Sequence, residues 1–142
     1  MVDVGGKAVV KRKATARGEI KLKPSTVVAV VEGKTKKGDV LSASKLAGIQ
    51  AAKATSSLLP LCHQIPLTSV SVEVVPKKDR VEVHCTVAAE YRTGVEMEAL
   101  VGAAAALLNI WDMVKYLEKD EKGQYPGTAI SEIRVVKKTK GV

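Results

Sequence analysis

The longest apolar run in the chain predicts one buried helix. Hydrophobic and small residues follow one another almost without a break from Ala99 to Ile110, and charged residues stand only at the ends of this segment. The run is too long for a strand and rich in alanine and leucine. It is bounded by Gly94 and by a glycine turn at 123–127, which favours a helix. The alanines and Gly102 would let another backbone approach closely.

Shorter patterns before and after this helix predict the other elements. Apolar and charged residues alternate loosely over residues 9–22, as in a strand with one solvated face. A short helix is expected from Pro24 to Gly33. An amphipathic helix is expected from Leu41 to Leu59, where Pro60 stops it. Three more strands are expected, over residues 69–75, 80–88 and 130–136, with a basic tail after the last.

The order of these elements is strand, two helices, hairpin, long helix and strand. Helices packed on one face of an antiparallel sheet would satisfy this order, so the sequence predicts an α+β fold. At 142 residues the chain is expected to form one domain, residues 1–142. It shows no internal repeat, low-complexity segment or interdomain linker.

Composition narrows the class of partner. The formal net charge of +8 indicates either an anionic partner or a composition adapted to heat, and both explanations stay open. An aromatic content of 3% argues against binding of single-stranded nucleic acid, which leaves phosphorylated small molecules as the favoured partners. Two cysteines give no disulfide framework. With no uninterrupted membrane-spanning run and no signal-peptide pattern, we expect a cytoplasmic protein without a membrane partner.

Charged residues at the ends of the long helix are the first candidates for a site. Glu96 and Glu98 stand in its first turn, where acids also complement the helix dipole. Asp112 and Lys115 are three residues apart and share a face. As a surface ion pair they would contribute little, but the neighbouring tryptophan and methionine favour a less exposed setting.

At two places in the chain a cysteine and a histidine are consecutive, which raises the question of a zinc site. Cys62-His63 and His84-Cys85 match no zinc-finger spacing, and adjacent strand residues point to opposite faces, so we expect no metal. Cys85 falls on the apolar side of its strand and is expected in the core. His63 lies in a stiff loop between two prolines, which is well suited to present an imidazole.

Lysines are the candidate phosphate ligands. Their compact positive charges bind phosphate, and burial can lower the pKa of a lysine enough for acid–base chemistry. The candidates stand at element ends or on otherwise apolar helices: Lys37, Lys53, Lys115 and Lys138. The loop 34–40 also fits an ordinary solvated loop, and its glycines form no Walker or Rossmann pattern.

Six blocks of unusual composition are spread over nearly the whole chain. They are Met1–Val4, Lys37–Val40, Ala47–Lys53, Pro60–His63, Thr93–Leu100, and Asp112-Met113 with Lys115. In this order they resemble the molybdenum-cofactor biosynthesis protein C family, the cyclic pyranopterin monophosphate synthases. The resemblance implies a ferredoxin-like fold and a homohexamer, a trimer of dimers with active sites between subunits.

The resemblance also implies the reaction. The substrate would be the cyclised GTP intermediate (8S)-3′,8-cyclo-7,8-dihydroguanosine 5′-triphosphate, and the products would be cyclic pyranopterin monophosphate and pyrophosphate. Such a rearrangement needs proton transfers and neutralisation of a triphosphate, and it implies no cofactor. A non-catalytic phosphate-binding scaffold that partners the radical enzyme of the same pathway is the alternative.

Matching blocks assign roles to individual residues. The resemblance implies that four residues are catalytic: Asp112, Lys37, Lys115 and His63. It implies substrate contacts for Leu61, Cys62, His63, Met97, Glu98, Lys53, Arg12 and Lys138. The family's usual ending, a lysine followed by Ser-Gly-Gly-Lys-Ser-Gly, differs here, because Lys138 is followed by Thr139-Lys140-Gly141-Val142.

Helix geometry bears on the shared site. Glu98 and Asp112 belong to one helical pattern and are separated by about 21 Å along its axis, at ~1.5 Å per residue. Their side chains cannot meet at one reacting centre within a chain. We therefore expect Glu98 of one subunit to face Asp112 of a neighbour across a two-fold axis.

Overall fold

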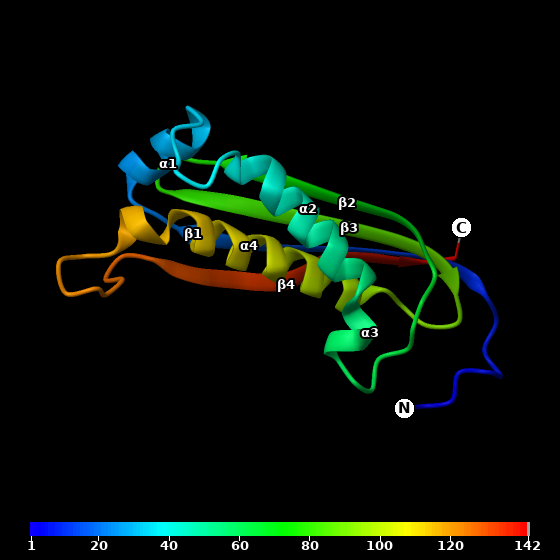
Figure 1. Ribbon diagram of the computed structural model, residues 1–142. Coiled ribbons are helices and arrows are strands. Elements are labelled where there is room, and N and C mark those ends of the chain that lie inside the picture. The colour runs from blue at the N-terminus through cyan, green and yellow to red at the C-terminus, as the bar shows by residue number, and fades with distance from the viewer. Residues whose placement is uncertain (142) are drawn as a thin grey trace.

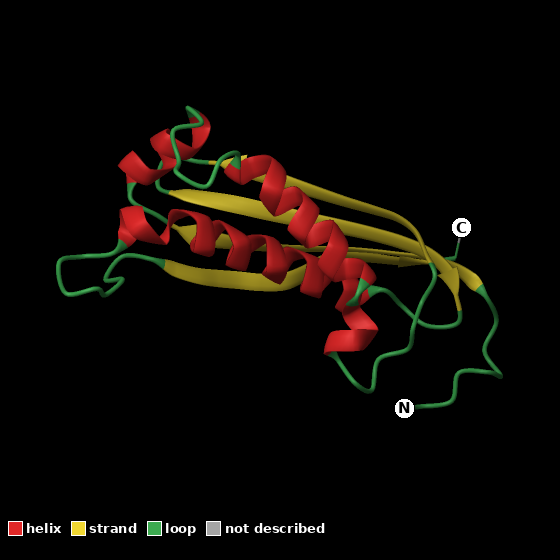
Figure 2. Ribbon diagram, viewed as in Figure 1, coloured by secondary structure: helices red, strands yellow, loops and turns green. Residues whose placement is uncertain are grey.

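The computed structural model describes residues 1–141, which form one antiparallel sheet with helices on one of its faces (Figures 1 and 2). The strand order is β2-β3-β1-β4, which confirms the predicted α+β, ferredoxin-like arrangement. The elements in chain order are β1 (Val10–Lys21), α1 (Pro24–Val31), α2 (Val40–Lys53), α3 (Thr55–Leu58), β2 (Leu67–Pro76), β3 (Arg80–Tyr91), α4 (Glu96–Glu118) and β4 (Ala129–Lys140).

The alternation of side chains along the strands separates a dry face from a solvated one. On β3, Val81, Val83 and Cys85 are fully buried beneath the helices, whereas Glu82 and His84 point to the open face. Burial raises the pKa of the Cys85 thiol to about 11, so this thiol is an inert core group. The prediction for Cys85 is confirmed, and His84 cannot share a metal ion with it.

Glycine allows α2 and α4 to pack closely over the sheet (Figure 1). A Cβ added at Gly102 would lie 2.5 Å from the Cys85 Sγ and 3.1 Å from the carbonyl oxygen of Gly48. A Cβ at Gly48 would in turn lie 3.0 Å from the Gly102 carbonyl oxygen. The backbone that approaches the alanine-rich stretch is therefore α2 of the same chain.

The helix α4 is long and apolar enough to span a membrane by length and composition alone. In this fold its apolar face is covered by β1, β3 and α2, and Ala99, Ala103 and Leu107 are fully buried. It is the core helix of the fold, and its exposed residues lie along the opposite face.

The two largest errors in the predicted boundaries concern α2 and β4. The helix expected over residues 41–59 is interrupted at Ala54, where the Thr55 hydroxyl donates to the Ala52 carbonyl at 2.9 Å. Such a local hydrogen bond competes with continuation of the helix. The basic tail expected after residue 136 instead continues β4 to Lys140, which pairs with Arg12 of β1. Lysines suit an edge strand because they discourage pairing with other chains.

Candidate active site

Asp112 lies between two lysines near the C-terminal end of α4. Its Oδ2 accepts from the Lys37 Nζ at 2.9 Å, and its Oδ1 is 3.3 Å from the Lys115 Nζ. The hydrogen bond from Lys37, followed by that from Lys115, holds the pKa of Asp112 below its ordinary value. The carboxylate is therefore ionised at neutral pH and paired with two cations.

This trio is more exposed than the sequence suggested. The side chains of Asp112 and Lys115 are 54% and 46% exposed. The neighbouring Trp111 and Met113 do not cover them, because successive helical residues point about 100° apart and the Met113 side chain is buried in the core. Within one chain, the expectation of a sheltered pair is wrong.

The opposite end of α4 contains a cationic cavity of about 490 Å³. Four cations and one carboxylate are among the lining residues, which are Lys7, Ala8, Val10, Arg12, Thr93, Gly94, Glu96, Lys138 and Lys140. The Nε of Arg12 is buried and has no hydrogen-bond partner within the described residues. The Nη2 of Arg12 donates to the Arg92 carbonyl oxygen at 3.2 Å. An anion with several oxygens would satisfy this set of donors.

Two glutamates in the first turn of α4 have pKa values displaced in opposite directions. Burial opposes ionisation of Glu96, but the 2.6 Å contact with Lys138 and the charge of Arg12 outweigh it and lower its pKa. Glu98 is 4% exposed, and burial, followed by the charge of Glu96, raises its pKa. A pair displaced in this way is typical of acid–base sites. Met97, between them, is 41% exposed.

His63 contacts the N-terminal segment. Its Nε2 lies 2.6 Å from the carbonyl oxygen of Val2. A carbonyl oxygen only accepts, so Nε2 carries the hydrogen and Nδ1 is left as the acceptor of the neutral ring. In the same loop, Leu61 is 72% exposed and Cys62 is partly buried.

Arg92 is a residue that the sequence analysis missed. Its Nη1 donates to the carbonyl oxygens of Gly5 and Lys7 at 2.8 and 2.6 Å, which anchors the N-terminal segment that reaches His63. These partners are more than eighty residues away in the sequence. No local pattern could have indicated the contact.

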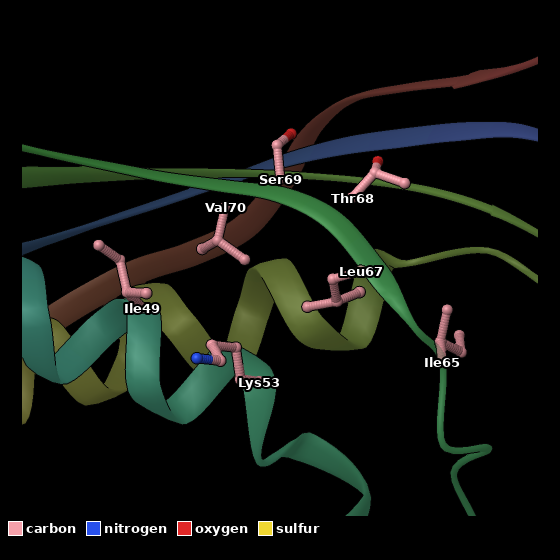
Figure 3. Close-up of a pocket in the computed structure, with 7 residues that line it drawn as sticks. All are labelled: Ile49, Lys53, Ile65, Leu67, Thr68, Ser69 and Val70. Atoms are coloured by element: carbon pink, nitrogen blue, oxygen red, sulfur yellow. The ribbon is translucent and has the colours of Figure 1, made fainter.

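Lys53 lies at a separate cavity of about 330 Å³ between α2 and β2 (Figure 3). Figure 3 shows its side chain on the same side of β2 as Ile49 and Leu67, whereas the hydroxyls of Thr68 and Ser69 point away. The cavity is mainly apolar, with one lysine among its lining residues, so its lining suits an apolar group that carries an anionic substituent.

The chain thus places the predicted site residues in groups at the two ends of α4. Asp112, Lys37 and Lys115 meet near the C-terminal end of α4, and Lys37 lies in the loop that leads into α2, which begins at Val40. Arg12, Lys138 and Glu98 belong to the opposite end, where α2 ends and the His63 loop begins. One chain does not bring these two groups together.

Comparison with known proteins identifies the family. The MoaC family pattern matches residues 1–141. "Probable cyclic pyranopterin monophosphate synthase" of Thermococcus kodakarensis is 58% identical over 99% of this chain and 90% of its own length. The protein of the same name from Sulfolobus acidocaldarius is 55% identical over 99% and 98%. A relative from Methanothermobacter thermautotrophicus, 54% identical over 99% and 88%, is named "Probable cyclic pyranopterin monophosphate synthase accessory protein". This chain belongs to the MoaC family.

Proposed function

We propose that this chain is a lyase of molybdenum cofactor biosynthesis that converts (8S)-3′,8-cyclo-7,8-dihydroguanosine 5′-triphosphate to cyclic pyranopterin monophosphate and pyrophosphate. Membership of the MoaC family over residues 1–141 supports it, as do the names of relatives at 55–58% identity. The structural observation that carries it is the cavity at the start of α4, where four cations can receive a phosphate chain beside Glu96. One of these cations is Arg12, which is incompletely hydrogen-bonded among the described residues.

The cations account for binding of the triphosphate. Lys138, Arg12 and Lys53 offer positive charge around two cavities, one lined by several charged residues and one mainly apolar. Lysine and arginine neutralise phosphate oxygens directly, and no metal is needed for this contribution. The apolar cavity beside Lys53 suits the ring system, and the exposed Leu61, Cys62 and Met97 offer further contact surface.

Carboxylates and imidazole account for the proton transfers. Glu98, whose pKa is raised by burial, holds a proton more readily than an ordinary glutamate and is suited to exchange it with the substrate. Asp112 stays ionised between Lys37 and Lys115, so it accepts a proton from the substrate while a lysine donates one. His63 presents Nδ1 as a second acceptor.

The active site is shared between subunits in this proposal. Glu98 and Asp112 lie on one continuous helix, about 21 Å apart along its axis. Exposed apolar side chains on the outer face of the helical layer support association of chains, since Leu46 and Leu108 are 66% and 63% exposed. The assembly is a homohexamer of three dimers in the cytoplasm, with no nucleic acid or membrane partner.

The test is a turnover assay with the purified protein alone. The protein is incubated with the cyclised GTP intermediate, and the amounts of pyrophosphate and of the pterin product are measured. Release of pyrophosphate with product formation supports the lyase. The name of the Methanothermobacter relative makes an accessory role the second candidate. Product that forms only after a second enzyme is added would identify that role and contradict the lyase.

A further inference from the structure

Two consecutive residues of the loop between α1 and α2 are bound by residues one turn apart on α4. The hydroxyl oxygen of Tyr116 accepts a hydrogen bond from the backbone N–H of Lys36 at 2.8 Å. The carboxylate of Asp112 accepts from the Nζ of Lys37 at 2.9 Å. Residues four apart share a helix face, so the phenol and the carboxylate hold adjacent positions of the loop.

The loop is also closed on itself. The Thr35 hydroxyl donates to the Gly38 carbonyl at 2.5 Å, and the Gly38 N–H donates to the Thr35 carbonyl at 3.3 Å. Gly38 adopts φ of +96°, a conformation that favours glycine. These bonds shape the turn around Lys36 and Lys37 but do not attach it to α4. Among the described residues, the hydrogen bond to Tyr116 attaches the loop backbone to that helix.

A second contact strengthens the attachment. The Nζ of Lys36 lies 5.0 Å from the centroid of the Tyr116 ring, within the range of a cation–π interaction. By contrast, the ion pair of Lys37 with Asp112 is half exposed, and exposed pairs with a flexible lysine are weak. The Lys37 Nζ also donates to the backbone carbonyl of Asp112 at 3.3 Å. Both contacts of the ammonium are with the exposed Asp112, so they form only when the loop backbone holds Lys37 within reach of that residue.

We propose that Tyr116 is a positioning residue of the active site: its hydroxyl fixes the loop at Lys36 so that the Lys37 ammonium stays on Asp112. This inference rests on the proposed function, because Lys37 and Asp112 are assigned to the reaction there. Tyr116 itself acts through the loop and does not contact the reacting atoms.

The test is Tyr116→Phe, which keeps the ring and its contact with Lys36 but removes the acceptor oxygen. Asp112 is the reporter, because Lys37 is the largest cause of its lowered pKa. Its carboxyl carbon is followed by ¹³C NMR during a pH titration without substrate. We expect the pKa of Asp112 to rise towards its ordinary value, and kcat to fall about fivefold, the effect typical of one neutral hydrogen bond.

The matched control is Tyr125→Phe, which removes a phenol hydroxyl from a ring that packs edge-on against Trp111. It should leave both the Asp112 titration and kcat unchanged. In a Lys37→Ala background, adding Tyr116→Phe should produce no further change in the pKa of Asp112, because the tyrosine acts through Lys37.

The inference is overturned if Asp112 titrates in Tyr116→Phe as it does in the wild type, whatever happens to kcat. A change in thermal stability without that titration shift indicates a merely structural tyrosine and has the same consequence. A wild-type protein that fails to turn over would refute the proposed function. The titration needs no substrate, so it still decides the role of Tyr116.

Discussion

The Oε1 of Glu118 accepts a hydrogen bond from the Thr128 hydroxyl at 2.7 Å, which ties the last residue of α4 to the connection that leads into β4. Its Oε2 accepts from the backbone N–H of Lys23 at 3.1 Å and from the Thr26 hydroxyl at 2.5 Å. Glu118 is 1% exposed, so one buried carboxylate joins the end of α4 to the start of α1 and to the connection before β4.

Glu118→Gln should destabilise the protein. The amide keeps the shape but removes the negative charge, so the charge-assisted hydrogen bonds from Lys23, Thr26 and Thr128 become neutral ones, which are about half as strong. Urea unfolding should show the loss as a lower midpoint with an unchanged slope. The control is Glu121→Gln, in the exposed turn after α4, which should be neutral. Equal midpoints for the two variants would contradict this account of Glu118.

Gly102→Ala should separate α2 from α4. The new methyl group would lie 2.5 Å from the Cys85 Sγ and 3.1 Å from a carbonyl oxygen of α2, and both neighbours are fixed in the core. Overpacking of this kind costs typically about 1–3 kcal/mol. Differential scanning calorimetry measures the loss. Gly127→Ala is the control, because a Cβ at Gly127 meets nothing within 4 Å. A Gly102→Ala protein as stable as Gly127→Ala would refute the close-approach argument.

His63 should be protonated on Nε2 in its neutral form, because Val2 offers a carbonyl oxygen there. Long-range ¹H–¹⁵N NMR at a pH above the histidine titration identifies the tautomer, and the chain contains two histidines, so assignment is simple. Arg92→Gln should loosen the N-terminal segment and allow both tautomers. A neutral His63 protonated on Nδ1 in the wild-type protein would rule out the hydrogen bond to Val2.

The sequence predicted most of the fold because the periodicity of the buried elements is strong. The apolar run of α4 and the alternation in β3 each have a single structural solution. The end of β4 was missed because an edge strand with both faces exposed loses its alternation: Lys138 and Lys140 look like a tail until their pairing with β1 is seen.

The candidate site was predicted less completely than the fold. The pair Asp112–Lys115 follows from helical spacing, and Lys37 joins it in the structure. Contacts such as Lys36 with Tyr116 depend on residues eighty positions apart and have no local signal. The exposure of Asp112 could not be predicted from the hydrophobic pattern either. The sequence does not show which other element packs on which face of α4.

Replacement of Glu98 by glutamine should stabilise the fold at neutral pH while it abolishes proton transfer. Burial raises the pKa of Glu98 in the folded state above its unfolded value. The contribution of Glu98 to the stability of the wild-type protein is therefore fully present below the unfolded pKa of about 4.3. This contribution is lost as the pH rises through the pKa of the folded state.

Glutamine does not titrate, so the gain in stability of Glu98→Gln over the wild type should be largest at pH 7 and vanish below about pH 4. Thermal unfolding across this range provides the measurement. The comparison variant is Glu96→Gln, which removes a carboxylate with a lowered pKa and should lose stability at pH 7. A Glu98→Gln protein that is less stable than the wild type at pH 7 would show that burial does not oppose the charge.

Complementation between two inactive variants tests the shared site. Glu98→Ala and Asp112→Asn should each reduce turnover by about a hundredfold or more, as loss of an acid–base group does. In a dimer that mixes the two, one site contains both defects and the other contains neither, because two-fold symmetry generates two equivalent sites. Activity should therefore return to a fraction of the wild-type value after subunits exchange, and native mass spectrometry confirms the exchange. The control mixture, Lys37→Ala with Asp112→Asn, should stay inactive, since Lys37 and Asp112 meet within one chain at 2.9 Å and every site keeps one defect. If exchange is complete and the first mixture is as inactive as the second, Glu98 and Asp112 do not act across a subunit interface.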